Sequence, residues 1–173
     1  MLILVLALLV GCNSSSGKQA DTKEDAEIVQ TILSASSSFS LDFPSNWEPS
    51  TMNKDAAIEM RLVSKGFYML VAEATPPNAE YTLGHYMEFL KKVVGPMVTS
   101  AEFTEVSDTV INGFSAKQFE MSGTLGRVET EFFITGLEHD GMFYQLTAWA
   151  DKTKYAEAKP VFDGILETIT FGS

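Results

Sequence analysis

Three glutamates on two neighbouring predicted strands are the side chains best suited to bind a metal ion. They are Glu120, Glu129 and Glu131, and the turn signal Leu125-Gly126 predicts a hairpin that brings all three to one face. In the expected register Glu120 lies opposite Glu131, and like charges in that arrangement need a cation, a basic neighbour or solvent. A hard, oxygen-liganded ion such as Ca²⁺ would suit them. The alternative is that the three glutamates are solvated and screened by Arg127 or by a lysine.

Cys12 is the only cysteine of the chain, so no internal disulfide is possible. The apolar run from Met1 to Val10 is too short to span a bilayer, which needs about 20 apolar residues, but it has the length of a signal-peptide core. Its ending, Leu9-Val10-Gly11-Cys12, resembles the bacterial lipobox, in which small residues precede an invariant cysteine. The resemblance implies that residues 1–11 are removed and that Cys12 carries a diacylglyceryl thioether. The alternative is a buried cysteine in a short core strand.

The residues around this cysteine complete the expected anchor. Residues 12–27 are rich in Ser, Asp, Lys and Gly and are predicted to be a flexible tether to a domain at residues 28–173. More than one acyl chain on Cys12 would hold the protein firmly to a membrane, since a single chain binds only marginally. A signal peptide normally begins with Lys or Arg, and none precedes this run. We therefore expect the natural start to lie upstream of Met1, or the sequence to be truncated.

Enzyme motifs are missing from the chain. It has no G-x-S-x-G, no Walker loop, no dinucleotide fingerprint and no H-E-x-x-H. His85 and His139 are expected at the surface, and nothing in the sequence pairs them with a nucleophile. Trp47 is expected either to cover the edge of the core or to stack on a ligand or partner. These observations predict a protein that is not an enzyme.

The net charge argues against nucleic acid as a partner. The chain of 173 residues carries 23 acidic and 12 basic side chains, which gives a formal charge of −11. Phosphate contacts need Lys and Arg, so binding to nucleic acid is not expected. The length is sufficient for one domain with a substantial core.

Hydrophobic periodicity predicts an α+β fold. Period-two alternation and turn signals at Asn112-Gly113 and Asp140-Gly141 predict a run of antiparallel strands between Glu102 and Ala150. Thr82 is expected to cap an amphipathic helix, and Pro160 is expected to begin a closing one. Further strands are expected at Ile28–Ala35, Phe39–Phe43, Ala56–Val63 and Phe67–Ala74. Because Phe67–Ala74 is apolar on both faces, it should be a central strand covered on both sides.

Several of these segments together resemble PsbP-like domains. The opening Phe39-Ser-Leu-Asp-Phe-Pro-Ser-Asn-Trp47 is similar to the start of such domains. The segments Tyr144-Gln-Leu-Thr-Ala-Trp149, Pro160-x-Phe162-x-x-Ile165 and Ile169-x-Phe171 are similar to their end. The resemblance covers about residues 28–172 and implies an α/β/α sandwich with a central, mainly antiparallel sheet and helices on its faces. That fold is shared by photosystem II extrinsic subunits and a Ran-binding nuclear transport protein, and the chain is similar in particular to bacterial lipoproteins of this fold.

These features lead to two functional hypotheses. The first is a non-catalytic, lipid-anchored binding or assembly module of a bacterial cell envelope, held at the membrane through Cys12 and acting by contact with an unknown protein. The second is a carrier of a small apolar ligand, because the plentiful Phe and Met could line a pocket between helix and sheet.

Overall fold

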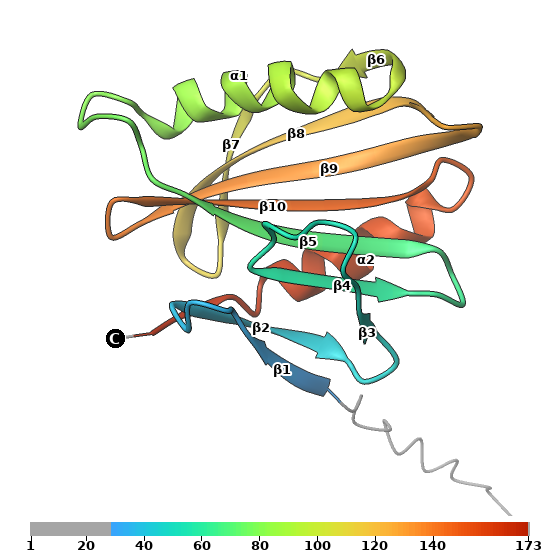
Figure 1. Cartoon of the computed structure of the whole chain (residues 1–173), viewed down its shortest axis with the longest axis horizontal. Helices are drawn as coiled ribbons and strands as arrows, with labels where there is room; N and C mark the ends of the chain where they lie inside the picture. Colours follow the sequence, from blue (N-terminus) through green and yellow to red (C-terminus); the bar gives the residue numbers. More distant parts are fainter. Residues whose placement is uncertain (1–28, 173) are drawn as a thin grey trace, which may run out of the picture.

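The computed structural model describes residues 29–172, and the strands of this segment form two antiparallel sheets (Figure 1). The predicted signal peptide, the lipidation site Cys12 and the tether lie outside the described residues. Lipidation therefore stays a prediction. Within residues 29–172, no helix is both long enough and apolar enough to cross a membrane.

The larger sheet has eight strands in the order β3-β4-β5-β10-β9-β8-β6, with β7 paired to β8. Its strands are β3 (Glu48–Pro49), β4 (Ile58–Leu62), β5 (Phe67–Ala74), β6 (Thr99–Phe103), β7 (Ser107–Ile111), β8 (Phe114–Leu125), β9 (Val128–His139) and β10 (Met142–Asp151). The hairpin of β4 and β5 was expected from the sequence and is confirmed. Strand β5 also takes the expected central position, between β4 and β10.

Helix α1 (Leu83–Val94) covers one face of the larger sheet, and the short 3₁₀ helix η1 (Gly95–Met97) follows it. The expected cap at Thr82 is confirmed, because its Oγ1 accepts a hydrogen bond from the backbone N–H of His85 at 3.4 Å. His85 Nδ1 in turn accepts from the backbone N–H of Thr82 at 3.2 Å, which completes a capping box. Gly136 of β9 lies under the helix, where any Cβ would collide with the Met87 sulfur. The missing side chain lets α1 approach the sheet closely.

The opposite face is covered by helix α2 (Tyr155–Leu166) together with a smaller sheet. This sheet contains β1 (Val29–Leu33), β2 (Phe39–Pro44) and β11 (Thr170–Phe171), in the order β1-β2-β11. Phe39, Leu41 and Phe43 alternate inward from β2 and are fully buried. The α+β class is therefore confirmed, but the layer opposite α1 is a helix plus a small sheet rather than helices alone. Pairing of β2 with β11, from opposite ends of the described chain, creates this additional sheet.

The start of α2 differs from the prediction. The sequence predicted a regular helix beginning at Pro160, whereas the helix begins at Tyr155 and contains Pro160 in its interior. Proline removes the hydrogen bond to the carbonyl four residues earlier, here that of Ala156. Both residues are exposed, so water can satisfy this carbonyl and the helix continues through the proline.

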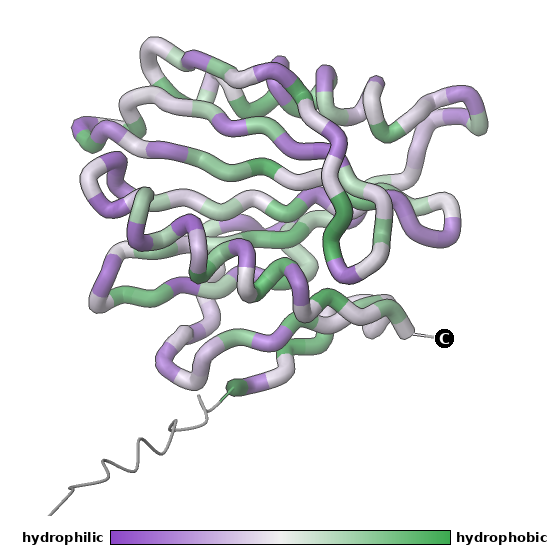
Figure 2. Tube along the Cα trace, turned by 180° about the vertical axis from the view of Figure 1, so that it is seen from behind, coloured by the Kyte–Doolittle hydropathy of each residue, from purple (hydrophilic) through white to green (hydrophobic). Residues whose placement is uncertain are grey.

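Hydrophilic stretches occur at many of the turns and also alternate with hydrophobic ones along the strands, as the tube coloured by hydropathy shows (Figure 2). The predicted turns Asn112-Gly113 and Asp140-Gly141 are confirmed, and all four residues have the positive φ that a type I′ turn requires. The described chain begins and ends beside the small sheet, away from α1 (Figure 1). The face that carries α1 is therefore free of both ends of the described chain.

Candidate functional site

An apolar groove of about 220 Å³ lies between α1 and the sheet, near the carboxyl end of the helix. We call it the α1 groove, and it is lined by Asn53, Leu70, Ala72, Val93, Val94, Met97, Met121, Leu125, Phe132, Ile134, Gln145, Thr147 and Trp149. At roughly 30 Å³ for each water molecule, the space equals about seven waters. It therefore has room for one alkyl chain or one ring, and is smaller than the pocket of a large cofactor.

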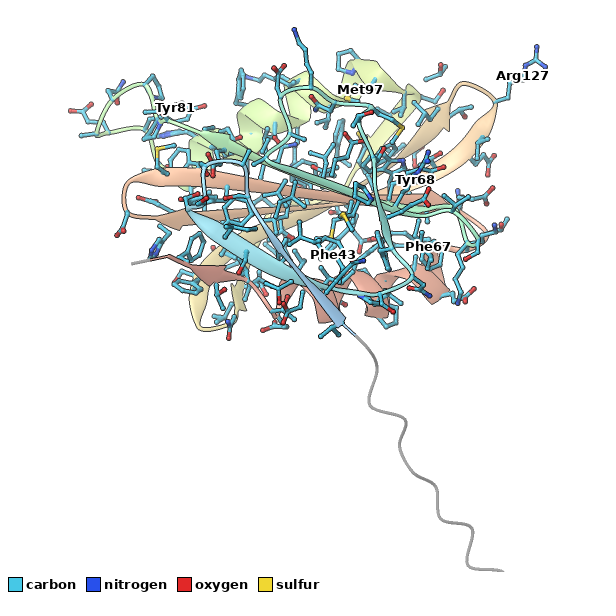
Figure 3. The ribbon with its side chains drawn as sticks, turned by 60° about the horizontal axis from the view of Figure 1, so that its bottom comes forward. Phe43, Phe67, Tyr68, Tyr81, Met97 and Arg127 are labelled. Atoms are coloured by element: carbon cyan, nitrogen blue, oxygen red, sulfur yellow. The ribbon has the colours of Figure 1, made fainter. Side chains whose placement is uncertain are left out.

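The outer rim of the groove is apolar and exposed. Val93, Met97 and Leu125 form this rim, with 48%, 61% and 40% of their surfaces accessible. Val93 and Met97 come from the end of α1 and from η1, whereas Leu125 comes from the tip of the β8–β9 hairpin. Figure 3 shows Met97 beside the end of α1 and Arg127 pointing away from the molecule at the hairpin tip. Exposed apolar side chains that surround an apolar hollow mark an interaction site.

The loop between β3 and β4 forms the opposite wall. Glu59 is buried on β4, and its carboxylate accepts hydrogen bonds from the backbone N–H groups of Met52 at 3.1 Å and Asn53 at 2.8 Å. Two charge-assisted hydrogen bonds fix the loop in place. Asn53 is thereby held where it lines the groove.

Strands β5 and β10 form the floor, which combines apolar surface with one polar pair. Leu70 and Ala72 of β5 lie opposite Thr147 and Gln145 of β10. Gln145 Nε2 donates a hydrogen bond to Thr147 Oγ1 at 2.9 Å. None of the described residues that line the groove is charged. An apolar hollow with a few convergent polar atoms is the usual form of a ligand site.

Aromatic packing fixes the two ends of the floor. At one end the ring of Trp149 stacks on Tyr68, with centroids 5.2 Å apart and planes at 10°. At the other end Tyr86 of α1 stacks on Phe143, and its hydroxyl faces Gln145 Oε1 at 3.5 Å. Burial, and then the charge of Tyr81, raises the pKa of Tyr86 to about 12. The Tyr86 hydroxyl therefore stays neutral at neutral pH, and its one O–H is directed at Gln145 Oε1.

Comparison with known proteins places this architecture among solved folds. No protein-family model and no curated protein matches the sequence. The solution structure of cyanobacterial PsbP from Synechocystis superposes with a TM-score of 0.66 at 13% identity, over 92% of this chain and 98% of that one. This chain has a PsbP-like fold.

Two other bacterial proteins share the arrangement. LpqN of Mycobacterium tuberculosis, which is described as involved in cell envelope biogenesis, matches with a TM-score of 0.61 at 13% identity, over 84% of this chain and 91% of that one. A Bacteroides thetaiotaomicron protein matches with a TM-score of 0.61 at 11% identity, over 83% of this chain and 48% of that one. The PsbP-like α+β fold expected from the sequence resemblance is thus confirmed, but the exact α/β/α layering is not. Function has to be argued from the site.

Trp47 lies in the core. It is 3% exposed and packs between Phe43 and Phe162, with ring centroids 5.5 Å and 6.5 Å away. Its indole Nε1 is buried and has no hydrogen-bond partner within residues 29–172. This position supports the predicted role at the core and leaves no surface for the alternative contact with a ligand or partner.

The β8–β9 turn differs by one residue from the prediction. Its two central residues are Gly126 and Arg127, so that Leu125 pairs with Val128, whereas the sequence predicted a turn at Leu125-Gly126. Gly126 has φ +65°, and a glycine with positive φ at the first central position fits a type II′ turn. The position of the glycine in the turn therefore sets the register of the whole hairpin.

The corrected register keeps the three glutamates on one face but removes the opposition of Glu120 and Glu131. Each glutamate lies opposite an uncharged residue: Glu120 opposite Phe133, Glu129 opposite Thr124 and Glu131 opposite Ser122. The new partners are displaced by two residues, and side chains alternate with a period of two, so the faces are unchanged. All three carboxylates lie on the α2 side of the sheet.

Lys152 is the basic neighbour of this face. Its Nζ lies 3.8 Å from Glu131 Oε1. Burial raises the pKa of Glu131 above its ordinary value, Lys152 opposes this effect, and the charges of Glu120, Glu102 and Glu129 add to it. Within residues 29–172, no three His, Cys, Asp or Glu side chains converge closely enough to hold a metal ion. Ca²⁺ binding thus stays a prediction without structural support, and melting temperatures with and without Ca²⁺ would test it.

Removing the charge at Glu131 should stabilise the protein at neutral pH. A carboxyl whose folded-state pKa is raised favours folding when it is protonated, below its unfolded pKa, and this contribution is lost as pH rises through the folded pKa. Glu131→Gln cannot ionise, so its melting temperature should exceed that of the parent by about 1 to 3 °C near pH 7. The difference should disappear near pH 3, below the unfolded pKa of about 4.3, where Glu131 is protonated in both states.

Glu138→Gln is the matched control, because Glu138 is an exposed residue at the end of the same strand. Thermal unfolding of the three proteins across this pH range measures the effect. A Glu131→Gln variant less stable than the parent at neutral pH would show that the pair with Lys152 outweighs the cost of burial.

The two histidines are held in structural roles. His85 is exposed, as predicted, and belongs to the capping box of α1. His139 was also predicted at the surface but is only half exposed, because its ring stacks on Phe171 of β11 with centroids 4.1 Å apart. Within residues 29–172, no histidine hydrogen-bonds to both a hydroxyl and a carboxylate, which is the arrangement of a nucleophilic triad.

Sequence reasoning offered a pocket between helix and sheet only as an alternative, the apolar-ligand carrier, and named none of the residues that line the groove, although one signal pointed to its place. Strand β5 is apolar on both faces, and the expectation was that both faces are covered. Instead α1 covers mainly β8 and β9, and Leu70 and Ala72 of β5 remain partly accessible on the floor of the groove. An apolar strand face that a single helix is too narrow to cover is the pattern that could have indicated the site.

Proposed function

We propose that this chain is a lipid-anchored, non-catalytic binding module of a bacterial cell envelope, and that the α1 groove is its ligand site. The observation that carries the proposal is the uncharged, apolar hollow of about 220 Å³ between α1 and the sheet. Such a hollow gains free energy by taking apolar surface out of water, at about 25 cal/mol for each Å². The occupant favoured by this geometry is a small apolar ligand, which corresponds to the predicted carrier.

Contact with a protein is the second candidate, and the exposed rim favours it. Val93, Met97 and Leu125 lie outside the hollow, where a small ligand would leave them in water. A partner that inserts one apolar side chain into the groove would cover the rim with its surrounding surface. The net charge of −11 argues against a nucleic acid as this partner.

The envelope location rests on the amino terminus and on the fold. Cys12 in its lipobox-like context is the proposed membrane attachment, and LpqN shows that the fold occurs in a protein of cell envelope biogenesis. The described chain starts at Val29 beside the small sheet, on the side away from α1 (Figure 1). An anchor attached there would leave the α1 groove accessible while the protein is bound to the membrane.

Site-specific photo-cross-linking in cells tests the proposal. A photoreactive amino acid at Val93, on the rim, is compared with the same amino acid at Val110, which is 61% exposed on β7. We expect a small-molecule adduct at position 93 that is absent at position 110 and absent when Ala72→Phe fills the groove. A protein adduct with the same dependence would favour the second candidate, and Cys12→Ala shows whether anchoring is needed. Equal labelling at both positions would contradict a site at the groove.

A further inference from the structure

The polar atoms on the floor of the α1 groove indicate what kind of head group its ligand carries. Gln145 and Thr147 bond to each other through Gln145 Nε2 and Thr147 Oγ1 at 2.9 Å. Within residues 29–172, the second N–H of the Gln145 amide and the O–H of Thr147 make no further hydrogen bond. Two donors therefore remain available to an acceptor atom in the groove.

The charges around these donors exclude an ionised head group. No lining residue is charged, and Glu59, the buried carboxylate next to the wall, is already bonded to Met52 and Asn53. Transfer of an unpaired charge from water into such a site is far more costly than transfer of a hydrogen-bonded neutral group. A carboxylate or an ammonium would find no counter-ion inside the groove.

The order of residues along β10 sets the direction in which a ligand would lie in the α1 groove. Gln145 lies towards Tyr86, whereas Trp149 lies at the other end of the floor, next to Phe132 and Tyr68. An alkyl chain that packs on Trp149 would thus point its polar end towards Gln145. The chain length is limited by the enclosed volume of about 220 Å³.

We propose that the α1 groove selects a small uncharged amphiphile, an alkyl chain that ends in a hydroxyl, ether, ester or amide oxygen, with Gln145 as the residue that recognises this oxygen. The inference rests on the proposed function of the groove as a ligand site, and it adds the chemical class of the ligand.

Three probes of equal chain length test the selection: 1-octanol, octanoate and octylammonium, measured near pH 7.5, where both ions are charged. Trp149 lines the groove, and Trp47 is the only other tryptophan, so Trp47→Phe leaves a single fluorescent reporter at the site. We expect 1-octanol to bind at least about tenfold more tightly than either ion. Octanoate or octylammonium binding as tightly as 1-octanol would overturn the inference.

Two matched variants separate recognition from a general effect of losing a glutamine. Gln145→Leu should weaken 1-octanol binding about fivefold, the typical effect of losing one hydrogen bond. Gln118→Leu should leave it unchanged, because Gln118 makes the equivalent bond to Thr135, at 3.0 Å, on the opposite face of the sheet. Equal effects of the two variants would also overturn the inference.

A failure of this inference can be told apart from a failure of the proposed function. If none of the probes changes the fluorescence of Trp149, the selection of an uncharged amphiphile is wrong. The cross-linking at Val93 then still decides independently whether the groove is a binding site.

Discussion

Replacing Ala72 with phenylalanine should abolish binding in the α1 groove and leave the domain folded. Ala72 lies on the floor of the groove, on β5, directly opposite Gln145 of β10. Its side chain is partly accessible, so a phenyl ring can extend into the hollow without displacing the core. Phenylalanine is also better suited to a strand than alanine. We expect the affinity for 1-octanol to fall at least about tenfold, because the ring takes the space of the ligand.

Two measurements check this prediction. Fluorescence titration of the Trp47→Phe background measures the affinity, and thermal unfolding should show a melting temperature within about 3 °C of the parent. Ala156→Phe, the same substitution at an exposed position of α2 on the opposite side of the sheet, is the control. Unchanged affinity in a folded Ala72→Phe variant would show that ligands bind elsewhere.

Of the substitutions proposed here, replacing Phe162 with alanine should lower the stability of the domain most. Phe162 of α2 is fully buried and packs against Trp47 and Phe67, with ring centroids 6.5 Å and 5.8 Å away. Truncation of a buried phenylalanine to alanine removes apolar contacts and leaves a cavity, at a cost of about 3 to 5 kcal/mol. For a domain of this size we expect the melting temperature to fall by roughly 6 to 20 °C.

Phe89→Ala is the control, since Phe89 is 49% exposed on α1. Its free energy of unfolding should change by about 0.5 kcal/mol at most. Thermal or denaturant unfolding of both variants measures the difference. If Phe162→Ala were as stable as the control, the packing of α2 against the sheet would not hold the described domain together.

Much of the fold could be predicted from the sequence because local rules decide it. The Asn-Gly and Asp-Gly turns require positive φ at two successive residues, and few dipeptides tolerate that conformation. The cap at Thr82 and the alternation in β2 depend on neighbours within a few residues. Pro160 was misread because its effect on the helix depends on whether water can reach the carbonyl of Ala156, and this is a tertiary property.

For the candidate metal site, too, local rules predicted one part and the tertiary structure decided the rest. The shared face of Glu120, Glu129 and Glu131 follows from the period of two alone, so it was predicted correctly even with the wrong register. Their partners depend on which residue of the turn takes positive φ, and Gly126 in the first central position decided it. Whether the three glutamates bind a metal depends on the distances between their side chains, and the sequence does not contain these distances.

The sequence by itself determined the α+β class, the position of most strands, the helix cap and the absence of known catalytic motifs. All of these follow from local conformational preferences and from the period of the apolar residues. Only the tertiary structure decided that Trp47 is buried, that β2 pairs with β11, and that α1 leaves part of β5 uncovered. The α1 groove exists because a single helix is narrower than the sheet it covers, and that mismatch depends on how distant segments pack together.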